Sequence, residues 1–150
     1  FSDVLTAFLA MDSYVELYKG GILPLEVFAA QKKDRDILVR VIVKKRPLRC
    51  AYLSKRNTRT DFPVLACAVS CLDGEYRAVI GARPARAMVI RDTEGILKEG
   101  ITGESAAAFG TYVKEHTPTG SNMRAGAEYR SLLAEVLTRR GLLEIGGIGQ

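Results

Sequence analysis

Residues Asp61–Ile90, DFPVLACAVSCLDGEYRAVIGARPARAMVI, form the stretch that decides the fold. Its first part, Phe62–Cys71, contains only apolar or small residues, which is typical of a strand covered on both faces. Asp73 and Gly74 follow, and Asp-Gly between two apolar runs is a strong hairpin signal, because a type I′ turn needs positive φ at both positions. The stretch therefore predicts an antiparallel hairpin at the centre of a sheet.

The segments on either side of the hairpin turn predict further strands. The return run, Tyr76–Ala82, mixes apolar with charged residues and favours a position nearer an edge of the sheet. Pro84 has no N–H group for a neighbouring strand, so we expect it to end this run or lie at an edge. The β-branched run Asp36–Lys45 predicts the first strand of the same sheet, and Arg49–Leu53 is a candidate for another. Residues 54–60 are polar and predict a loop.

Helical periodicity appears before and after these strands. Asp3–Met11 predicts a short helix, Ser13–Tyr18 alternates as a strand does, and Leu23–Ala30 fits a short helix or a turn. After the hairpin, residues 92–99 and a segment that opens at Thr102–Glu104 each predict a helix. With a third helix near the C-terminus, this order indicates the α+β class: an antiparallel sheet of three to four strands, with three helices packed on one face.

The last expected helix, from Asn122 to Arg140, has the clearest amphipathic pattern. Asn122 suits the N-cap position, and Gly141 suits a helix stop. The apolar stripe consists of Tyr129, Leu132, Leu133, Val136 and Leu137. We expect the four aliphatic residues of this stripe to be buried against the sheet.

Composition indicates an ordinary globular protein. The chain has 150 residues, of which 47% are hydrophobic and 26% charged, and a net charge of +5. The sequence has no run of about 18 apolar residues, so no membrane span is predicted. Its three cysteines include no CxxC pair and are too few for a four-thiolate iron–sulfur site. Reduced thiols favour a cytoplasmic location.

Ordinary catalytic groups are scarce in this sequence. His116 is the only histidine and falls at the end of an expected helix, where a favourable C-terminal cation is its more common role. We find no glycine-rich phosphate loop before a helix and no spacing typical of metal ligands. No catalytic residue is therefore predicted.

A basic run is the one unusual electrostatic feature of the chain. Its seven cations are Lys44, Lys45, Arg46, Arg49, Lys55, Arg56 and Arg59, with no acid between them. Three interpretations stay open: a solvated surface, an anion or cofactor surface, and a nucleic-acid surface. The single aromatic residue of the run, Tyr52, disfavours the third.

Several segments, in order, resemble one family. YLSKRNTRTDFPVLACAVS, DGEYRAVIGARPARA and MRAGAEYRSLLAEVLTRRGL are similar to the C-terminal domain of the FAD-binding subunit of molybdenum hydroxylases, the xanthine dehydrogenase and carbon monoxide dehydrogenase type. At the N-terminus, FSDVLTAFLAMDSYVELYKGG resembles the end of the FAD-binding domain that precedes it. The resemblance covers nearly the whole chain and is closest to bacterial xanthine dehydrogenase-like flavin subunits.

This resemblance implies a division of the chain into two parts. Residues 1–32 would be the tail of a truncated FAD-binding domain, and residues 33–150 the flavoprotein C-terminal domain. The two glycine-rich segments that hold the FAD pyrophosphate in the family would lie upstream of Phe1. We therefore expect that the chain alone does not retain FAD.

Three residues match positions that contact the flavin in relatives. They are Asp3, Leu38 and Lys55. A helix cap is the alternative role for Asp3, and a plain core position is the alternative for Leu38. The segment from Lys55 to Asp61 is two residues shorter than is usual in the family, and so the register of this match is open. A cation at Lys55 would stabilise the negative charge of reduced flavin.

The resemblance also implies partners and cofactors. In such enzymes a molybdenum subunit hydroxylates a heteroaromatic substrate, and electrons pass through iron–sulfur clusters to FAD and then to NAD. FAD would belong to the complete subunit, whereas molybdopterin and 2Fe-2S clusters would lie on partner subunits; a homo-oligomer is possible, and binding to nucleic acid or membrane is not expected. The alternatives are a docking domain without a direct flavin role and a nucleic-acid-binding module.

Overall fold

The computed structural model describes residues 3–32 and 35–148, and this part forms two antiparallel sheets with four helices. The larger sheet, in the order β4-β5-β6-β7, contains β4 (Arg49–Arg56), β5 (Pro63–Leu72), β6 (Glu75–Gly81) and β7 (Met88–Arg91). The smaller sheet, in the order β2-β1-β3, contains β1 (Tyr14–Leu17), β2 (Gly21–Pro24) and β3 (Leu38–Ile42). The helices are α1 (Asp3–Ala10), α2 (Leu25–Ala30), α3 (Gly103–Glu115) and α4 (Ala127–Ile145). The predicted α+β class is confirmed.

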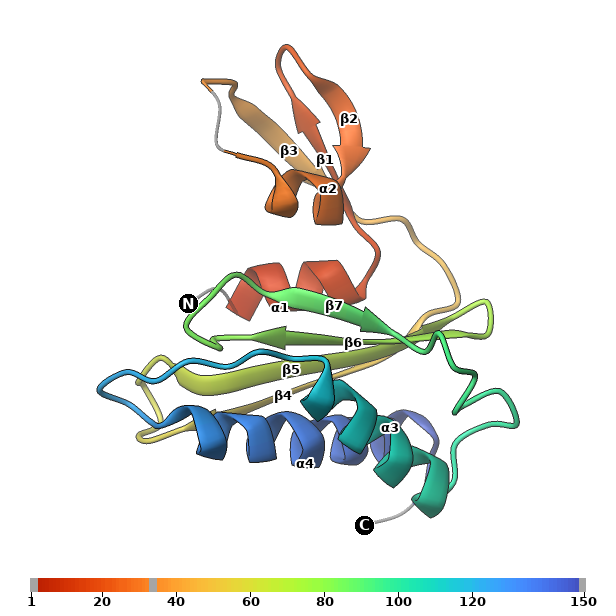
Figure 1. Cartoon of the computed structure of the whole chain (residues 1–150). Helices are drawn as coiled ribbons and strands as arrows, with labels where there is room; N and C mark the ends of the chain where they lie inside the picture. The colour runs from red at the N-terminus through yellow and green to blue at the C-terminus, as the bar shows by residue number, and fades with distance from the viewer. Residues whose placement is uncertain (1–2, 33–34, 149–150) are drawn as a thin grey trace.

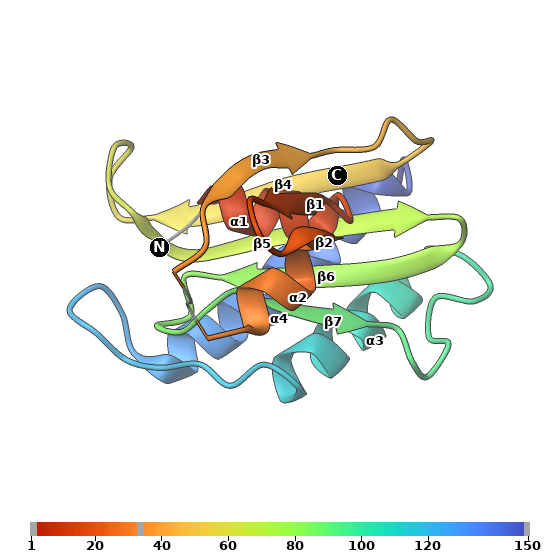
Figure 2. The same ribbon diagram turned by 90° about the horizontal axis from the view of Figure 1, so that it is seen from above.

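Helices cover both faces of the larger sheet (Figure 1). α3 and α4 lie on one face, while α1 lies on the other, between the larger sheet and the smaller one. Figure 2 looks down on the smaller sheet and α2, with the larger sheet beneath them. The prediction of one sheet with three helices on one face is therefore wrong. α1 takes the opposite face, and residues 92–99 form turns instead of a helix, with Asp92 accepting hydrogen bonds from two backbone N–H groups.

β5 and β6 form the predicted hairpin. Asp73 and Gly74 have φ values of 51° and 83°, the left-handed geometry that a type I′ turn requires. All ten residues of β5 are buried, because α4 packs on one face of the strand and α1 on the other. β6 is an interior strand next to the edge strand β7, since β5 pairs with one of its sides and β7 with the other.

Two apolar clusters meet at β5, one on each face. Cys67 and Val69 pack with Phe109 and other residues of the two C-terminal helices. Ala68, between them in sequence, packs with Leu9 on the α1 side. This alternation follows from the two-residue period of a strand, and it assigns each residue of the neighbouring strands to one of the two faces.

The β-branched run that was predicted to join the main sheet lies in the smaller sheet. β3 pairs with β1, so that Val41 lies opposite Val15. Side-chain composition identifies this run as a strand, but it does not specify the partner, which is a long-range choice. The predicted domain boundary between residues 32 and 33 stays a prediction. β1 precedes this boundary and β3 follows it, and the two strands pair in one sheet.

α4 begins and ends later than the sequence predicted. Asn122 does not cap it; instead its side-chain oxygen accepts a hydrogen bond from Arg130 at 2.6 Å. Gly141 lies inside the helix, where a Cβ atom would come within 2.7 Å of Val69 Cγ2. The glycine thus allows a close approach of α4 to β5 and does not end the helix.

The buried face of α4 is rotated relative to the predicted stripe. Leu133 and Leu137 are buried as predicted. The members of the stripe that are exposed or half-buried are Tyr129, Leu132 and Val136. Arg130 takes a place on the buried face, which apolar periodicity cannot detect because arginine is usually an exposed residue.

Arg130 is fully buried, and its acceptors among the described residues are uncharged. Its guanidinium donates to the carbonyl of Val64 at 2.9 Å, of Gly120 at 2.7 Å and of Ala125 at 2.6 Å, in addition to the Asn122 side chain. Burial lowers the pKa of this group. These bonds attach the loop before α4 to the start of β5.

Substitution of neighbouring leucines tests this face of α4. Leu133→Ala leaves a cavity in the core, so we expect the free energy of unfolding to fall by about 2–5 kcal/mol. Leu132→Ala, at a side chain that is 49% exposed, should change it by less than about 1 kcal/mol. Urea unfolding followed by circular dichroism measures both, and equal losses would contradict the observed orientation of α4.

Candidate functional site

A cavity of about 500 Å³ lies between α1, the smaller sheet, α2 and the loop before β7. Its apolar walls come from Leu5, Leu17, Phe28 and Leu38. Arg86 contributes a polar group to the rim. Apolar walls with a few polar groups are typical of a site for a small molecule or a ring system of a cofactor.

Leu38 is the one predicted flavin contact that lines this cavity. β3 places it opposite Leu17, another residue of the cavity wall. The side chain is 43% exposed, so it is not a plain core residue among the described residues. An exposed leucine on a cavity wall is available to a bound molecule.

Arg86 connects the loop before β7 to α2 at the cavity. Its Nη1 donates to the backbone carbonyls of Ala29 at 2.8 Å, Ala30 at 3.2 Å and Gln31 at 3.1 Å. These carbonyls lie at the C-terminal end of α2, where no following helical turn provides N–H groups for them. A cation at this position is therefore favourable. Arg86 thereby fixes the end of α2 beside the cavity.

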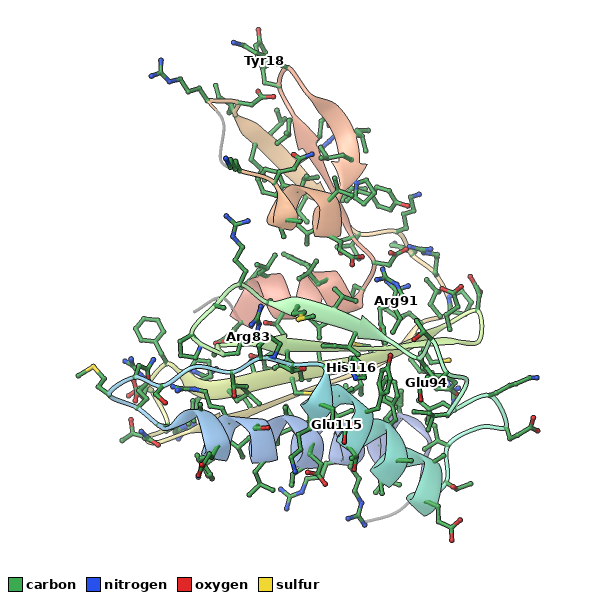
Figure 3. All side chains as sticks on the ribbon, viewed as in Figure 1. Tyr18, Arg83, Arg91, Glu94, Glu115 and His116 are labelled. Carbon is green, nitrogen blue, oxygen red and sulfur yellow. The ribbon has the colours of Figure 1, made fainter. Side chains whose placement is uncertain are left out.

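Two further arginines lie at the two ends of β7, Arg83 in the loop before the strand and Arg91 at its last residue (Figure 3). Arg83 donates to the carbonyl of Arg86 at 2.8 Å and to that of Pro118 at 2.7 Å, which fixes the loop before β7. Arg91 of β7 forms an ion pair with Glu26 of α2, and this pair lowers the pKa of Glu26. Both contacts support the position of α2 over the larger sheet.

Asp3 forms an ion pair at the start of α1. Its Oδ2 accepts a hydrogen bond from Arg56 Nη2 at 2.6 Å, and Arg56 Nη1 donates to the Asp61 carbonyl at 2.6 Å. The Tyr52 phenol lies beside the pair. Its pKa is raised to about 12, first by burial and then by the Asp3 carboxylate, so it stays protonated at neutral pH.

Lys55 lies in β4 instead of the predicted loop. Side chains alternate along a strand, so Lys55 points to the same face as Leu53, which packs on the α4 side. Tyr52 and Arg56 point to the opposite face, where Asp3 lies. The structure therefore brings Asp3 together with Arg56 and places Lys55, an exposed residue, on the other side of the sheet.

The basic run is distributed over separate positions. Arg46 and Arg56 form ion pairs with two different aspartates. Lys44 lies over the ring of Tyr14, with 4.1 Å between its Nζ and the ring centroid. Cations that are consecutive in sequence thus serve different contacts, because a strand turns neighbouring side chains to opposite faces.

Asp12 links the two segments of the chain that run between the smaller and the larger sheet. It lies in the turn after α1 with φ of 51°, and Arg46 lies in the segment that leads from β3 to β4. Asp12 Oδ2 accepts from Arg46 at 2.8 Å, and Oδ1 accepts from Arg77 of β6 at 3.0 Å. Burial raises the pKa of Asp12, but the two arginines outweigh it and hold the pKa below its ordinary value of 3.8.

Three other features are a possible metal site, a possible membrane-spanning helix and the single histidine. Within 3–32 and 35–148, no group of three or more His, Cys, Asp or Glu side chains is arranged to hold a metal ion. No helix in that part of the chain has the length and apolarity needed to cross a membrane. His116 ends α3, where its Nδ1 lies 2.8 Å from the Tyr112 carbonyl and its ring packs on the Tyr112 ring.

Residues 51–145 match the family described as the CO dehydrogenase flavoprotein C-terminal domain. The chain belongs to this family. The match begins in β4 and ends with α4, so it comprises the larger sheet and the two helices on its outer face. A search of curated protein sequences gave no match.

Solved structures share the fold over nearly the whole chain. Quinoline 2-oxidoreductase from Pseudomonas putida 86 has a TM-score of 0.77 at 16% identity, covering 97% of this chain and 56% of that one. CO dehydrogenase from Hydrogenophaga pseudoflava has a TM-score of 0.76 at 17% identity, covering 95% and 55%. Reconstituted CO dehydrogenase from Oligotropha carboxidovorans gives 0.75 at 16% identity, over 97% and 56%. The chain spans just over half the length of the chains it matches, and identities this low show the fold alone.

The position of α1, which carries Asp3 and Leu5, depends on a glycine in β6. A Cβ atom at Gly81 would lie 2.0 Å from Thr6 Oγ1. We expect Gly81→Ala to displace α1 and to lower the free energy of unfolding by about 1–3 kcal/mol. Adding Thr6→Ala should restore part of this loss, whereas Gly103→Ala, with no atom within 4 Å of its Cβ, is the matched control. Thermal denaturation measures all three; a double variant no more stable than Gly81→Ala would refute the close-contact explanation.

Asp12 makes the junction of the two sheets sensitive to acid. Because its folded pKa lies below 3.8, its contribution is fully present above that pH and is lost as the pH falls through the folded value. We expect Asp12→Asn to cost about 1–3 kcal/mol at pH 7, since Arg77 is only 5% exposed and loses its acceptor. The difference from wild type should narrow below pH 4 in urea unfolding. Asp73→Asn is the control, because Asp73 has the same φ of 51° in an exposed turn; a difference independent of pH would contradict the role of the Asp12 charge.

Proposed function

We propose that the chain is the C-terminal part of the FAD-binding subunit of a molybdenum hydroxylase, where it helps to position FAD for electron transfer from iron–sulfur clusters to NAD. Its family membership supports a place in a flavoprotein subunit. The structures with the same fold include CO dehydrogenase and quinoline 2-oxidoreductase. The observation that carries the proposal is the cavity beside α1, which Leu38 lines.

The residues around this cavity fit a flavin. Leu5 and Leu38 offer apolar surface to the faces of a ring system. On the first turn of α1, Asp3 Oδ1 is buried and receives no hydrogen bond from the described residues, 3–32 and 35–148. An unsatisfied buried acceptor costs about 1–3 kcal/mol, and a donor on a bound molecule would remove that cost. When bound, FAD supplies the redox chemistry, and these residues orient it.

The proposal extends to the rest of the subunit and its partners. Residues 1–32 would be the end of an FAD-binding domain, and residues 33–150 the C-terminal domain. Molybdopterin and 2Fe-2S clusters would lie on partner subunits, in a xanthine dehydrogenase-like enzyme of the cytoplasm. Of the three flavin contacts carried over from the resemblance, Leu38 gains support from its position on the cavity wall, whereas Asp3 and Lys55 do not line the cavity.

A second function, the docking of other subunits, is favoured by the exposed side chains around β3. Val39, Val41 and Val43 are 53%, 37% and 44% exposed. The three valines lie on or next to β3, an edge strand of the smaller sheet, and exposed apolar side chains there are typical of a strand that another polypeptide covers. This function does not compete with the first one, because none of the three valines lines the cavity.

Replacing Leu38 tests the flavin site in the complete subunit. Leu38→Ala removes apolar contact with the ring system, which we expect to weaken FAD binding about tenfold, equivalent to about 1.4 kcal/mol. Val39→Ala is the control, since Val39 lies next to Leu38 on the same strand but does not line the cavity. Titration of the apo-subunit with FAD, followed by flavin fluorescence, gives both dissociation constants. Equal affinities in wild type and Leu38→Ala would count against a flavin in this cavity.

A further inference from the structure

The segment from residue 37 to residue 60 contains no acidic residue and forms two edge strands of the molecule. β3 is an edge of the smaller sheet and β4 an edge of the larger one, so each has one side with which no described strand pairs. Seen from above, β3 and β4 run along the same side of the molecule (Figure 2). We call this side the basic flank, and its cations are Arg40, Lys44, Lys45, Arg46, Arg49, Lys55, Arg56 and Arg59.

The basic flank carries the excess positive charge of the chain. Three of its eight cations, Arg40, Arg46 and Arg56, form ion pairs with an aspartate or a glutamate. The other five have no ion pair among residues 3–32 and 35–148. Their charge equals the net charge of +5 of the whole chain, so the remaining acids and bases balance one another. An anionic partner is therefore attracted to this flank in preference to the rest of the surface.

The same flank offers groups to which an added polypeptide strand can bind. A strand edge without a neighbour leaves alternate N–H and C=O groups unpaired, and an extended peptide can form hydrogen bonds with them. β4 has eight residues along such an edge. The apolar side chains of Val39, Val43 and Tyr52 are exposed on or next to the two edge strands. A segment bound here therefore gains main-chain hydrogen bonds and buries apolar surface.

The charge of the basic flank decides which partner fits it. A second copy of the chain would bring two cationic edges together, and like charges on paired strands repel each other. A nucleic acid would bind the cations but would leave the strand edge and the valines unused. On the basis of the proposed docking function, we propose that the basic flank binds an extended segment rich in aspartate and glutamate from another subunit of the enzyme. This segment pairs with the outer edge of β4 as an additional strand.

Thiol labelling of the complete subunit tests where the partner binds. Cys50 of β4 is exposed, whereas Cys67 and Cys71 are buried. We expect a maleimide to label Cys50 in the free subunit, and to label it at least about tenfold more slowly once the partner subunits are bound, because an added strand covers this edge. Mass spectrometry of the peptide that contains Cys50 gives both rates. Equal rates in the free subunit and in the complex would overturn the inference.

Charge reversal tests the electrostatic part of the inference. We expect Lys45→Glu to raise the dissociation constant for the partner subunits about tenfold at low salt, and to have a smaller effect at high salt. Lys98→Glu is the matched control, since Lys98 is exposed and lies in the loop after β7, the other edge of the larger sheet. It should stay within about twofold of wild type. Equal losses in the two variants would show that net charge alone guides assembly, which contradicts a specific flank.

Further outcomes separate this inference from the function on which it rests. A complete subunit that forms no complex with the partner subunits would refute the docking function itself, whereas a complex that leaves Cys50 fully reactive refutes only the role of the basic flank. A random-sequence DNA duplex that protects Cys50 at physiological salt would identify a nucleic-acid surface and overturn the inference. Lys45→Glu should leave the FAD content and the thermal stability of the subunit unchanged, so that its effect reports on docking.

Discussion

One strand, β5, has to be covered on both faces, and the arrangement of the other elements depends on that requirement. All ten of its residues are buried, so the sheet cannot leave either side to solvent. α4 reaches one face through Gly141, and α1 reaches the other through contact with Gly81, at distances that a larger side chain would not allow. Because α1 must lie on the sheet, the smaller sheet that follows it is held above, and the cavity lies between them.

Local signals in the sequence predicted the elements, whereas their long-range partners were not predictable. The hairpin turn at Asp73 and Gly74 follows from two adjacent residues that tolerate positive φ, and the structure confirms it. The pairing of β3 with β1 could not be inferred, because a β-branched run is compatible with any neighbouring strand. The face of α4 was misassigned for a different reason: Arg130 is buried, and patterns of apolar residues place arginine outside.

The candidate site shows the same division between local and long-range information. The resemblance supplied Asp3 and Leu38; Leu38 lines the cavity, whereas Asp3 forms an ion pair with Arg56 at the start of α1. It could not predict on which face Lys55 lies, because one residue of register decides which face of a strand a side chain occupies. Arg86 had no signal in the sequence beyond its charge, since its role depends on carbonyls at the end of α2 that are more than fifty positions away.

The buried guanidinium of Arg130 also has a consequence for how the domain loses its structure. Its acceptors lie on β5 and on the loop before α4, and all must be in place together for the buried charge to keep its hydrogen bonds. Partial opening of this loop would leave the Arg130 cation without hydrogen-bond acceptors in an apolar interior. Its free-energy cost is therefore higher than that of opening an ordinary surface loop. The loop therefore belongs to the same cooperative unit as the central strand, and local fraying at this end of the molecule is suppressed until the domain unfolds as a whole.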